Sequence, residues 1–264
     1  SLVWQLAQKL RHSARPFPKG CCERGFAPLF SIRFAWSYMN YLQLVARLKR
    51  KCRVTGAAPA SIENATSEEV NRLMDWINEA WMDIQETRQD WEWMRGSCSF
   101  TTVAGQAIYT PAEAGVTDFG NWTRDTWRIY TTSVGMPSEQ FLIYRDYESW
   151  RNLYQFGSMR TSQTQPVDLT ITPEKSIGLG PLPTAGYTVI GDYFKLPTEM
   201  SLNADTPALP GRFHMLIVYR AMMFYGVSEA APEVYEEGKT EFNRMMSRVT
   251  ENNLPELMAT GEFA

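Results

Sequence analysis

The stretch that decides the fold is TSEEVNRLMDWINEAWMDIQETRQDWEWM, residues 66–94. Its apolar residues recur at steps of three and four, which predicts one long amphipathic helix reaching about Met94. Thr66 and Glu69 stand at the spacing of a capping box, so we expect Thr66 to cap this helix. We interpret the apolar stripe as facing the core rather than a cofactor, and it consists of Val70, Leu73, Met74, Ile77, Trp81, Ile84 and Trp91.

Shorter helical patterns stand on both sides of this stretch. From Met39 the residues Leu42, Val45 and Leu48 predict a first helix, and Gly56 offers a left-handed stop. Beyond Pro207 and Pro210 two more helices are predicted. One carries Phe213, Leu216, Ile217, Met223 and Phe224, and the other begins at Pro232 and carries Tyr235, Phe242, Met245, Met246 and Val249.

The middle of the chain has the composition of short strands. After Gly96, β-branched and aromatic runs alternate with Gly, Pro, Asp and Asn, which favours a small antiparallel sandwich or barrel. A helix is expected at 147–156. The expected strands are 98–103, 107–109, 126–132, 140–144, 167–172, 176–179 and 187–195.

These patterns together predict the α+β class. We expect a helical bundle formed by N- and C-terminal helices, at 39–97 and 207–252, with an inserted antiparallel β module at 98–200 and a C-terminal tail at 253–264. Residues 1–38 hold six basic side chains and one acidic one, a net charge of +5 in a chain of net charge −3, so the remainder carries −8. We interpret this basic leader as lying outside the fold, as a tag or as upstream translation, because the helical pattern begins at Met39.

The sequence offers little for catalysis. Its two histidines are His12, in the leader, and His214, which lies between apolar neighbours and is interpreted as structural. Four cysteines without C-x-x-C spacing indicate reduced thiols and no zinc site. Gly178 to Pro181 is interpreted as a strand ending in a turn, since Pro181 removes an amide that a phosphate cradle needs. We therefore expect no enzyme, no cofactor, no metal site and, lacking a long apolar run, no membrane span.

Three groups of residues leave functional alternatives open. The acids Asp83, Glu86, Asp90 and Glu92 read as a hydrated helix face, with a peptidoglycan-cleaving carboxylate pair as the alternative. Trp122, Trp127 and Tyr130 read mainly as core, with a tail-associated glycan-binding platform as the alternative. The basic run Arg47, Lys49, Arg50, Lys51 and Arg53 reads as a solvated helix end, with DNA phosphates as the alternative partner.

Longer phrases carry a family resemblance. MNYLQLVARLKRKCRVTG at 39–56 and the stretch 66–109, above all WINEAWMDIQ and DWEWM, resemble the opening of phage head-to-tail adaptor (head completion, or connector) proteins. SIGLGPLPTAGYTVIGDYFKLPTEM at 176–200 and DTPALPGRFHMLIVYRAMMFYG at 205–226 are similar to the end of that family's β module and its return to helix. The resemblance runs from Met39 to about Pro255.

The resemblance implies a structural virion protein at the head-tail junction, assembled in the host cytoplasm. Such a subunit forms a homo-oligomeric ring, commonly twelvefold, under the portal protein, joins it to tail or nozzle proteins, and extends the channel for double-stranded DNA without sequence-specific binding. Family adaptors often grip the portal with their C-terminal segment. Here the apolar residues of that segment are Leu254, Leu257, Met258 and Phe263.

Overall fold

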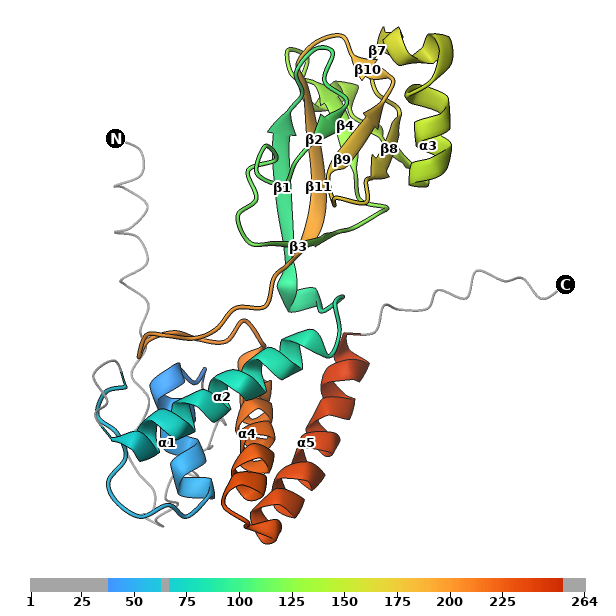
Figure 1. The fold of residues 1–264 in the computed structure, drawn as a ribbon. Coiled ribbons are helices and arrows are strands. Elements are labelled where there is room, and N and C mark those ends of the chain that lie inside the picture. The colour runs from blue at the N-terminus through green and yellow to red at the C-terminus, as the bar shows by residue number, and fades with distance from the viewer. Residues whose placement is uncertain (1–37, 63–66, 254–264) are drawn as a thin grey trace, which may run out of the picture. The chain divides into compact units, whose positions relative to one another are not determined.

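The computed structural model describes residues 38–62 and 67–253, in which a helical part and a β part can be distinguished (Figure 1). The helical part contains α1 (Tyr41–Lys51), α2 (Glu68–Glu86), η1 (Glu92–Met94), η4 (Gly211–Phe213), α4 (Met215–Ser228) and α5 (Pro232–Asn252). The β part occupies 95–195, between the two helical segments of the chain. The predicted α+β class, with helices from both ends of the chain and β structure inserted between them, is confirmed.

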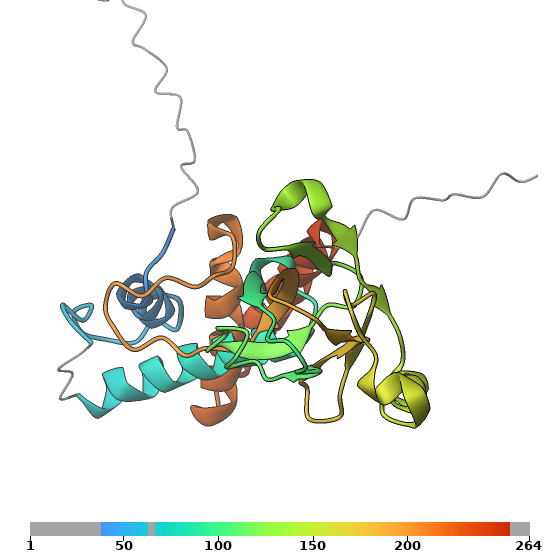
Figure 2. The ribbon, with the colours of Figure 1, turned by 90° about the horizontal axis from the view of Figure 1, so that it is seen from above.

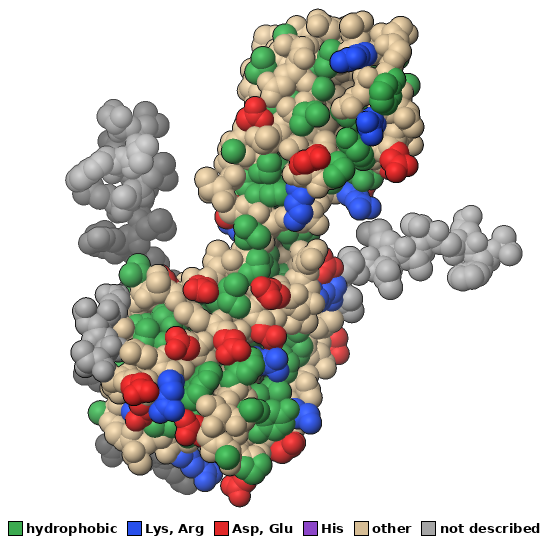
Figure 3. Space-filling view, in the orientation of Figure 1, with side chains coloured by type: hydrophobic (Ala, Val, Ile, Leu, Met, Phe, Trp, Pro, Cys, Tyr) green, Lys and Arg blue, Asp and Glu red, His purple; other side chains and the backbone are tan. Residues whose placement is uncertain are grey.

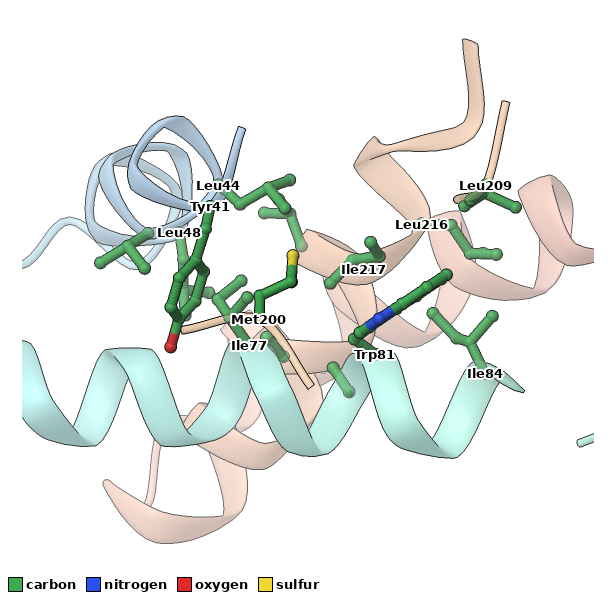
Figure 4. Close-up of a cluster of buried hydrophobic side chains, with 14 of the residues drawn as sticks. Tyr41, Leu44, Leu48, Ile77, Trp81, Ile84, Met200, Leu209, Leu216 and Ile217 are labelled. Carbon is green, nitrogen blue, oxygen red and sulfur yellow. The ribbon is translucent and has the colours of Figure 1, made fainter. Parts of the chain in front are cut away.

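Helix α4 is the central helix of the bundle. Its sequence MLIVYRAMMFYGVS is apolar almost all the way round, and it contacts α1, α2 and α5. A helix that is apolar on every side is stable only when other elements cover it. Figure 4 shows the resulting core, to which the segment before α4 also contributes Met200 and Leu209. The remaining labelled side chains are Tyr41, Leu44 and Leu48 of α1, Ile77, Trp81 and Ile84 of α2, and Leu216 and Ile217 of α4.

Two sheets make the body of the β part. The first has the order β1-β11-β4-β5, with β3 also pairing with β11, and the second has the order β2-β9-β8-β6. Pairs β6-β8 and β7-β10 are parallel and the other pairs are antiparallel. The strands are β1 (Arg95–Thr101), β2 (Ile108–Tyr109), β3 (Phe119–Trp122), β4 (Arg128–Thr131), β5 (Gln140–Phe141), β6 (Ile143–Tyr144), β7 (Gln163–Thr164), β8 (Asp168–Ile171), β9 (Ile177–Gly180), β10 (Leu182–Pro183) and β11 (Tyr187–Lys195).

A second apolar core fills the β part. Ile129 of β4 and Trp127, just before that strand, point inward with Val189 of β11 and Leu169 of β8, and all four are fully buried. Helix α3 (Tyr147–Tyr154) packs on β8, and the side chains of Trp150 and Tyr154 occupy the space that Gly178 and Gly180 leave on β9. The turns η2 (Met136–Ser138) and η3 (Gly157–Thr161) complete the β part.

The prediction of one helix reaching Met94 was wrong. Helix α2 ends at Glu86, the chain turns, and η1 follows. Trp91 is nevertheless fully buried, because its indole N–H donates to the carbonyl of Ile84, 3.0 Å away, and holds the ring against the last turn of α2. The turn therefore brings Trp91 back to the helix face that an uninterrupted helix would have given it.

The expected helix caps also differ. Thr66 lies outside the described residues, Ser67 holds the N-cap position without a side-chain hydrogen bond, and Glu69 accepts from Lys49 instead of capping. Helix α1 begins at Tyr41 after a capping box of Asn40 and Gln43, and ends at Lys51, before Gly56.

The remaining elements agree with the predicted ones to within a few residues, apart from four strands or strand pairs. Strands β3, β7 and β10 were not predicted. The single expected strand 140–144 is divided into β5 and β6, which belong to different sheets. The domain limits 39–97, 98–200 and 207–252 stay predictions. Of the predicted leader 1–38 and tail 253–264, all but Tyr38 and Asn253 lie outside the described residues.

Candidate assembly surface

The one histidine that the structure describes is a structural residue. The His214 side chain is fully buried, its Nδ1 accepts from the main-chain N–H of Met39 at 2.8 Å, and its Nε2 lies 2.8 Å from the carbonyl oxygen of Leu209. Burial lowers the pKa of this imidazole, so it stays neutral. Both ring nitrogens are engaged, which leaves no nitrogen for a substrate or a metal.

The described cysteines are equally inert. Cys52 and Cys98 are buried free thiols, and burial raises the pKa of Cys52 to about 12 and that of Cys98 to about 11. A nucleophilic cysteine needs a thiolate, and these environments oppose one. Within 38–62 and 67–253, no group of three His, Cys, Asp or Glu side chains could hold a metal ion, and no helix is long and apolar enough to cross a membrane.

The candidate catalytic acids lie at or beyond the exposed side of α2 and are partly committed to ion pairs. Asp83 binds Arg220 at 2.8 Å, and Asp90 accepts two hydrogen bonds of 2.9 Å from Arg88. The Arg88 hydrogen bonds lower the pKa of Asp90, whereas a general acid needs a raised one. Glu86 and Glu92 are exposed. This arrangement is that of a hydrated face.

Two of the five residues of the basic run pair within the bundle, whereas Arg47, Arg50 and Arg53 are exposed. Lys49 is buried and binds Glu69 at 2.8 Å, and Lys51 binds Glu237 at 2.8 Å. These two lysines join α1 to α2 and α5. They are therefore not available as a free cationic patch for DNA phosphates.

The aromatic residues proposed as a sugar platform do not share a surface. Trp122 and Trp127 are 3% and 0% exposed and pack edge to face at 5.3 Å in the β core. Tyr130 lies on the opposite, outer face of β4, because side chains alternate along a strand and Trp127 and Ile129 point inward. The core interpretation of the two tryptophans is confirmed.

Four large apolar side chains on the segment from the end of β4 to β6 are exposed instead. Val134, Met136, Phe141 and Ile143 are 60%, 75%, 64% and 63% exposed, and we call these four residues the apolar rim. In Figure 2 the loop that carries Met136 projects from the β part. Single exposed apolar residues are ordinary, but four within one ten-residue segment make this segment a candidate interaction surface.

The apolar rim was not predicted from the sequence. Its only signal is Phe141-Leu142-Ile143, in which apolar residues occupy both sides of one short strand although only Leu142 is buried. One side of such a strand normally faces water and is polar. Apolar residues on both sides of 141–143 therefore indicate an interaction surface.

A known family matches almost the whole described fold. The family model for the SU10 adaptor protein matches residues 39–260. The chain belongs to the SU10 adaptor protein family. This is a phage head-tail adaptor-type family of structural proteins, and membership implies contacts with portal and tail components at the head-tail junction of the virion. No curated protein matches the chain.

The family match begins at Met39, where the first helical pattern of the sequence begins. It extends beyond α5 and includes Leu254, Leu257 and Met258, although not Phe263. All four predicted portal contacts lie outside the described residues. The portal contacts of this SU10 adaptor family member therefore stay predictions.

Proposed function

We propose that the chain is a head-to-tail adaptor subunit that forms a twelvefold ring under the portal protein, joins the capsid to tail or nozzle proteins, and extends the DNA channel. The family match over 39–260 carries the proposal, because it spans every described helix and strand. A cyclic ring needs two complementary surfaces on each copy, and this chain is rich in the aromatic and Met residues that interfaces favour. The ring assembles in the host cytoplasm and stays in the virion.

We propose no catalytic role for this subunit. The imidazole of His214, the thiols of Cys52 and Cys98, and the carboxylates of Asp83 and Asp90 are all buried or paired in structural contacts. A glycan-binding role loses its proposed platform, since its two tryptophans lie in the core. Because these side chains are buried or paired, we propose that the subunit functions by binding other proteins through its surface.

The charge of the fold suits a channel for DNA. The net charge of 39–264 is −8, against +5 in the leader. A lumen lined by carboxylates repels phosphates and lets double-stranded DNA slide without sequence-specific contacts. A ring whose lumen is neutral or basic would contradict this part of the proposal.

The portal contact is assigned to the apolar residues of the tail, Leu254, Leu257, Met258 and Phe263. Within the part of the chain that the structure describes, both cores are closed by residues up to Val249. We therefore expect the shortened chain to keep its melting temperature and to lose co-sedimentation with portal rings.

A full-length control separates the apolar residues from the length of the tail. Replacing the four apolar residues by Ser should abolish attachment, whereas Glu256→Gln with Glu262→Gln should leave it unchanged. Equal attachment of the shortened and the full-length chain would refute the assignment of the portal contact to the tail.

A further inference from the structure

Two exposed arginines lie over aromatic side chains of the segment that carries the apolar rim. The guanidinium of Arg128 lies over the ring of Phe141 at 4.3 Å, and that of Arg124 lies over the ring of Tyr144 at 5.2 Å. Arg128 also binds the exposed Glu139 at 3.2 Å, whereas Arg124 has no ion-pair partner among the described residues. Apolar, aromatic and Arg side chains together form the composition typical of interface centres.

Helix α2 presents the complementary charge. Asp75, Glu79 and Glu86 are exposed, and none of them has an ion-pair partner within 38–62 and 67–253. They are spaced four and seven residues apart, so they share one face with the half-buried Met82. We call these four residues the acidic α2 face. Figure 3 shows carboxylates lying over the side of the helical part that carries α2.

Like charges on one helix face repel each other. Asp75 and Glu79 stand at the i,i+4 spacing, at which two carboxylates destabilise a helix. An incoming guanidinium would relieve that repulsion, and Met82 offers an adaptable apolar contact between the acids. The acidic α2 face therefore fits a partner that is both apolar and basic.

We infer that the apolar rim, with Arg124 and Arg128, docks on the acidic α2 face of the adjacent copy in the ring. This inference rests on the proposed ring and names the surfaces that close it. Each copy carries both surfaces, so the contact is head-to-tail, and a closed ring leaves neither surface free. Complementary charge sets the orientation, and the buried apolar rim supplies the area.

Charge reversal tests the docking. The first variant carries Arg124→Glu with Arg128→Glu, and the second carries Asp75→Lys with Glu79→Lys. Each alone places like charges together, so we expect ring assembly on the portal to weaken by about tenfold or more. A chain with all four changes restores opposite charges and should assemble within a fewfold of wild type. Ring occupancy on portals, measured by mass photometry, reports each result.

Mixing the two variants gives an independent measurement. The reversed rim of one variant is complementary to the reversed α2 face of the other, and their unchanged surfaces also match. The mixture should therefore form rings in which the two variants alternate, although neither forms them alone. If the reversed rim lowers the melting temperature, Arg124→Gln with Arg128→Gln replaces it, with weaker assembly expected.

The outcomes separate this docking from the proposed function. If wild-type rings form and each reversed variant assembles equally well, or if the fourfold change and the mixture rescue nothing, the docking is overturned and the ring stands. If the wild-type chain forms no ring on the portal, the ring and the docking are both overturned. Loss in each variant with rescue in both combinations supports the docking.

Discussion

The main-chain N–H of Met39 donates a hydrogen bond to Nδ1 of the buried His214, 2.8 Å away. This bond joins the segment that enters α1 to the N-cap residue of α4, although the two residues lie far apart in sequence. It requires an unprotonated Nδ1, and the carbonyl of Leu209 accepts from Nε2 on the other side of the ring. A second proton would face the Met39 donor and break the contact.

The His214 contact predicts a loss of stability in mild acid. Burial lowers the pKa of His214 in the folded state, so the unfolded chain binds the proton first. The contribution is fully present above the ordinary histidine pKa of about 6.5 and is lost as pH falls toward the lowered value, by up to about 1.4 kcal/mol per pH unit. Urea unfolding at pH 7.5 and 5.5 measures it, with His214→Gln as the non-titrating control. Equal losses in both chains would contradict the assignment.

We expect that a side chain larger than glycine at position 191 would clash with Trp127 in the β core. A Cβ at Gly191 would overlap the indole of Trp127, the residue before β4, and both residues are buried. Gly191→Ala should therefore cost about 1–3 kcal/mol of unfolding free energy. Gly186→Ala is the matched control, because the nearest atom to its Cβ is Thr101 Cγ2 at 3.4 Å. A cost at Gly191 no larger than at Gly186 would mean that the indole lies elsewhere.

We expect the hydrogen bonds of Asp168 to stabilise the packing of α3 on β8. Its buried Oδ2 accepts from Arg145 Nε at 2.9 Å and from the Tyr154 hydroxyl at 2.7 Å. Asp168→Ala leaves the Tyr154 hydroxyl without its partner and should cost about 1–3 kcal/mol. Glu139→Gln, which breaks the exposed pair with Arg128, should cost less than about 1 kcal/mol. Denaturant unfolding of both variants checks the difference, which should vanish if Asp168 is solvated.

We expect Trp91 to stabilise the turn after α2 more than Trp93 does. The two indoles stack at 4.2 Å, but only Trp91 donates its N–H, to the carbonyl of Ile84, while the buried Nε1 of Trp93 has no hydrogen-bond partner among the described residues. Trp91→Phe should therefore lose about 0.5–1.5 kcal/mol beyond the loss from Trp93→Phe. Thermal unfolding compares them. A larger loss from Trp93→Phe would show that the Trp91 bond does not secure this turn.

The end of α2 shows why the sequence could not predict where this helix ends. Ile84 and Trp91 are seven residues apart, so they share a face of an ideal helix. Apolar periodicity therefore continues through the turn and cannot reveal that the helix has ended at Glu86. Only the indole hydrogen bond distinguishes the two arrangements, and it depends on a side-chain contact that periodicity does not encode.

Strand β3 shows a second limit. Its sequence Phe-Gly-Asn-Trp contains two residues that strands disfavour. Gly120 is required there because a Cβ would lie 2.8 Å from the carbonyl oxygen of Lys195, beside the irregular register of β3 and β11. The same glycine that makes the pairing possible thus hides the strand from a propensity argument.

Core positions were more predictable than surfaces. Alternation along the expected strand 126–132 placed Trp127 and Ile129 together inside, and the structure confirms both. The apolar rim was missed because exposure depends on the crossing of 140–144 from one sheet to the other, which local sequence does not specify. Interaction surfaces are therefore the part of this protein that needs the structure.

Electron microscopy of the full-length chain bound to its portal tests the central claim most directly. We predict a closed twelvefold ring of this chain under the portal, with density continuing the axial channel. A chain that stays a discrete monomer in the presence of portal rings, or that binds them without forming a ring, would contradict the proposed adaptor function.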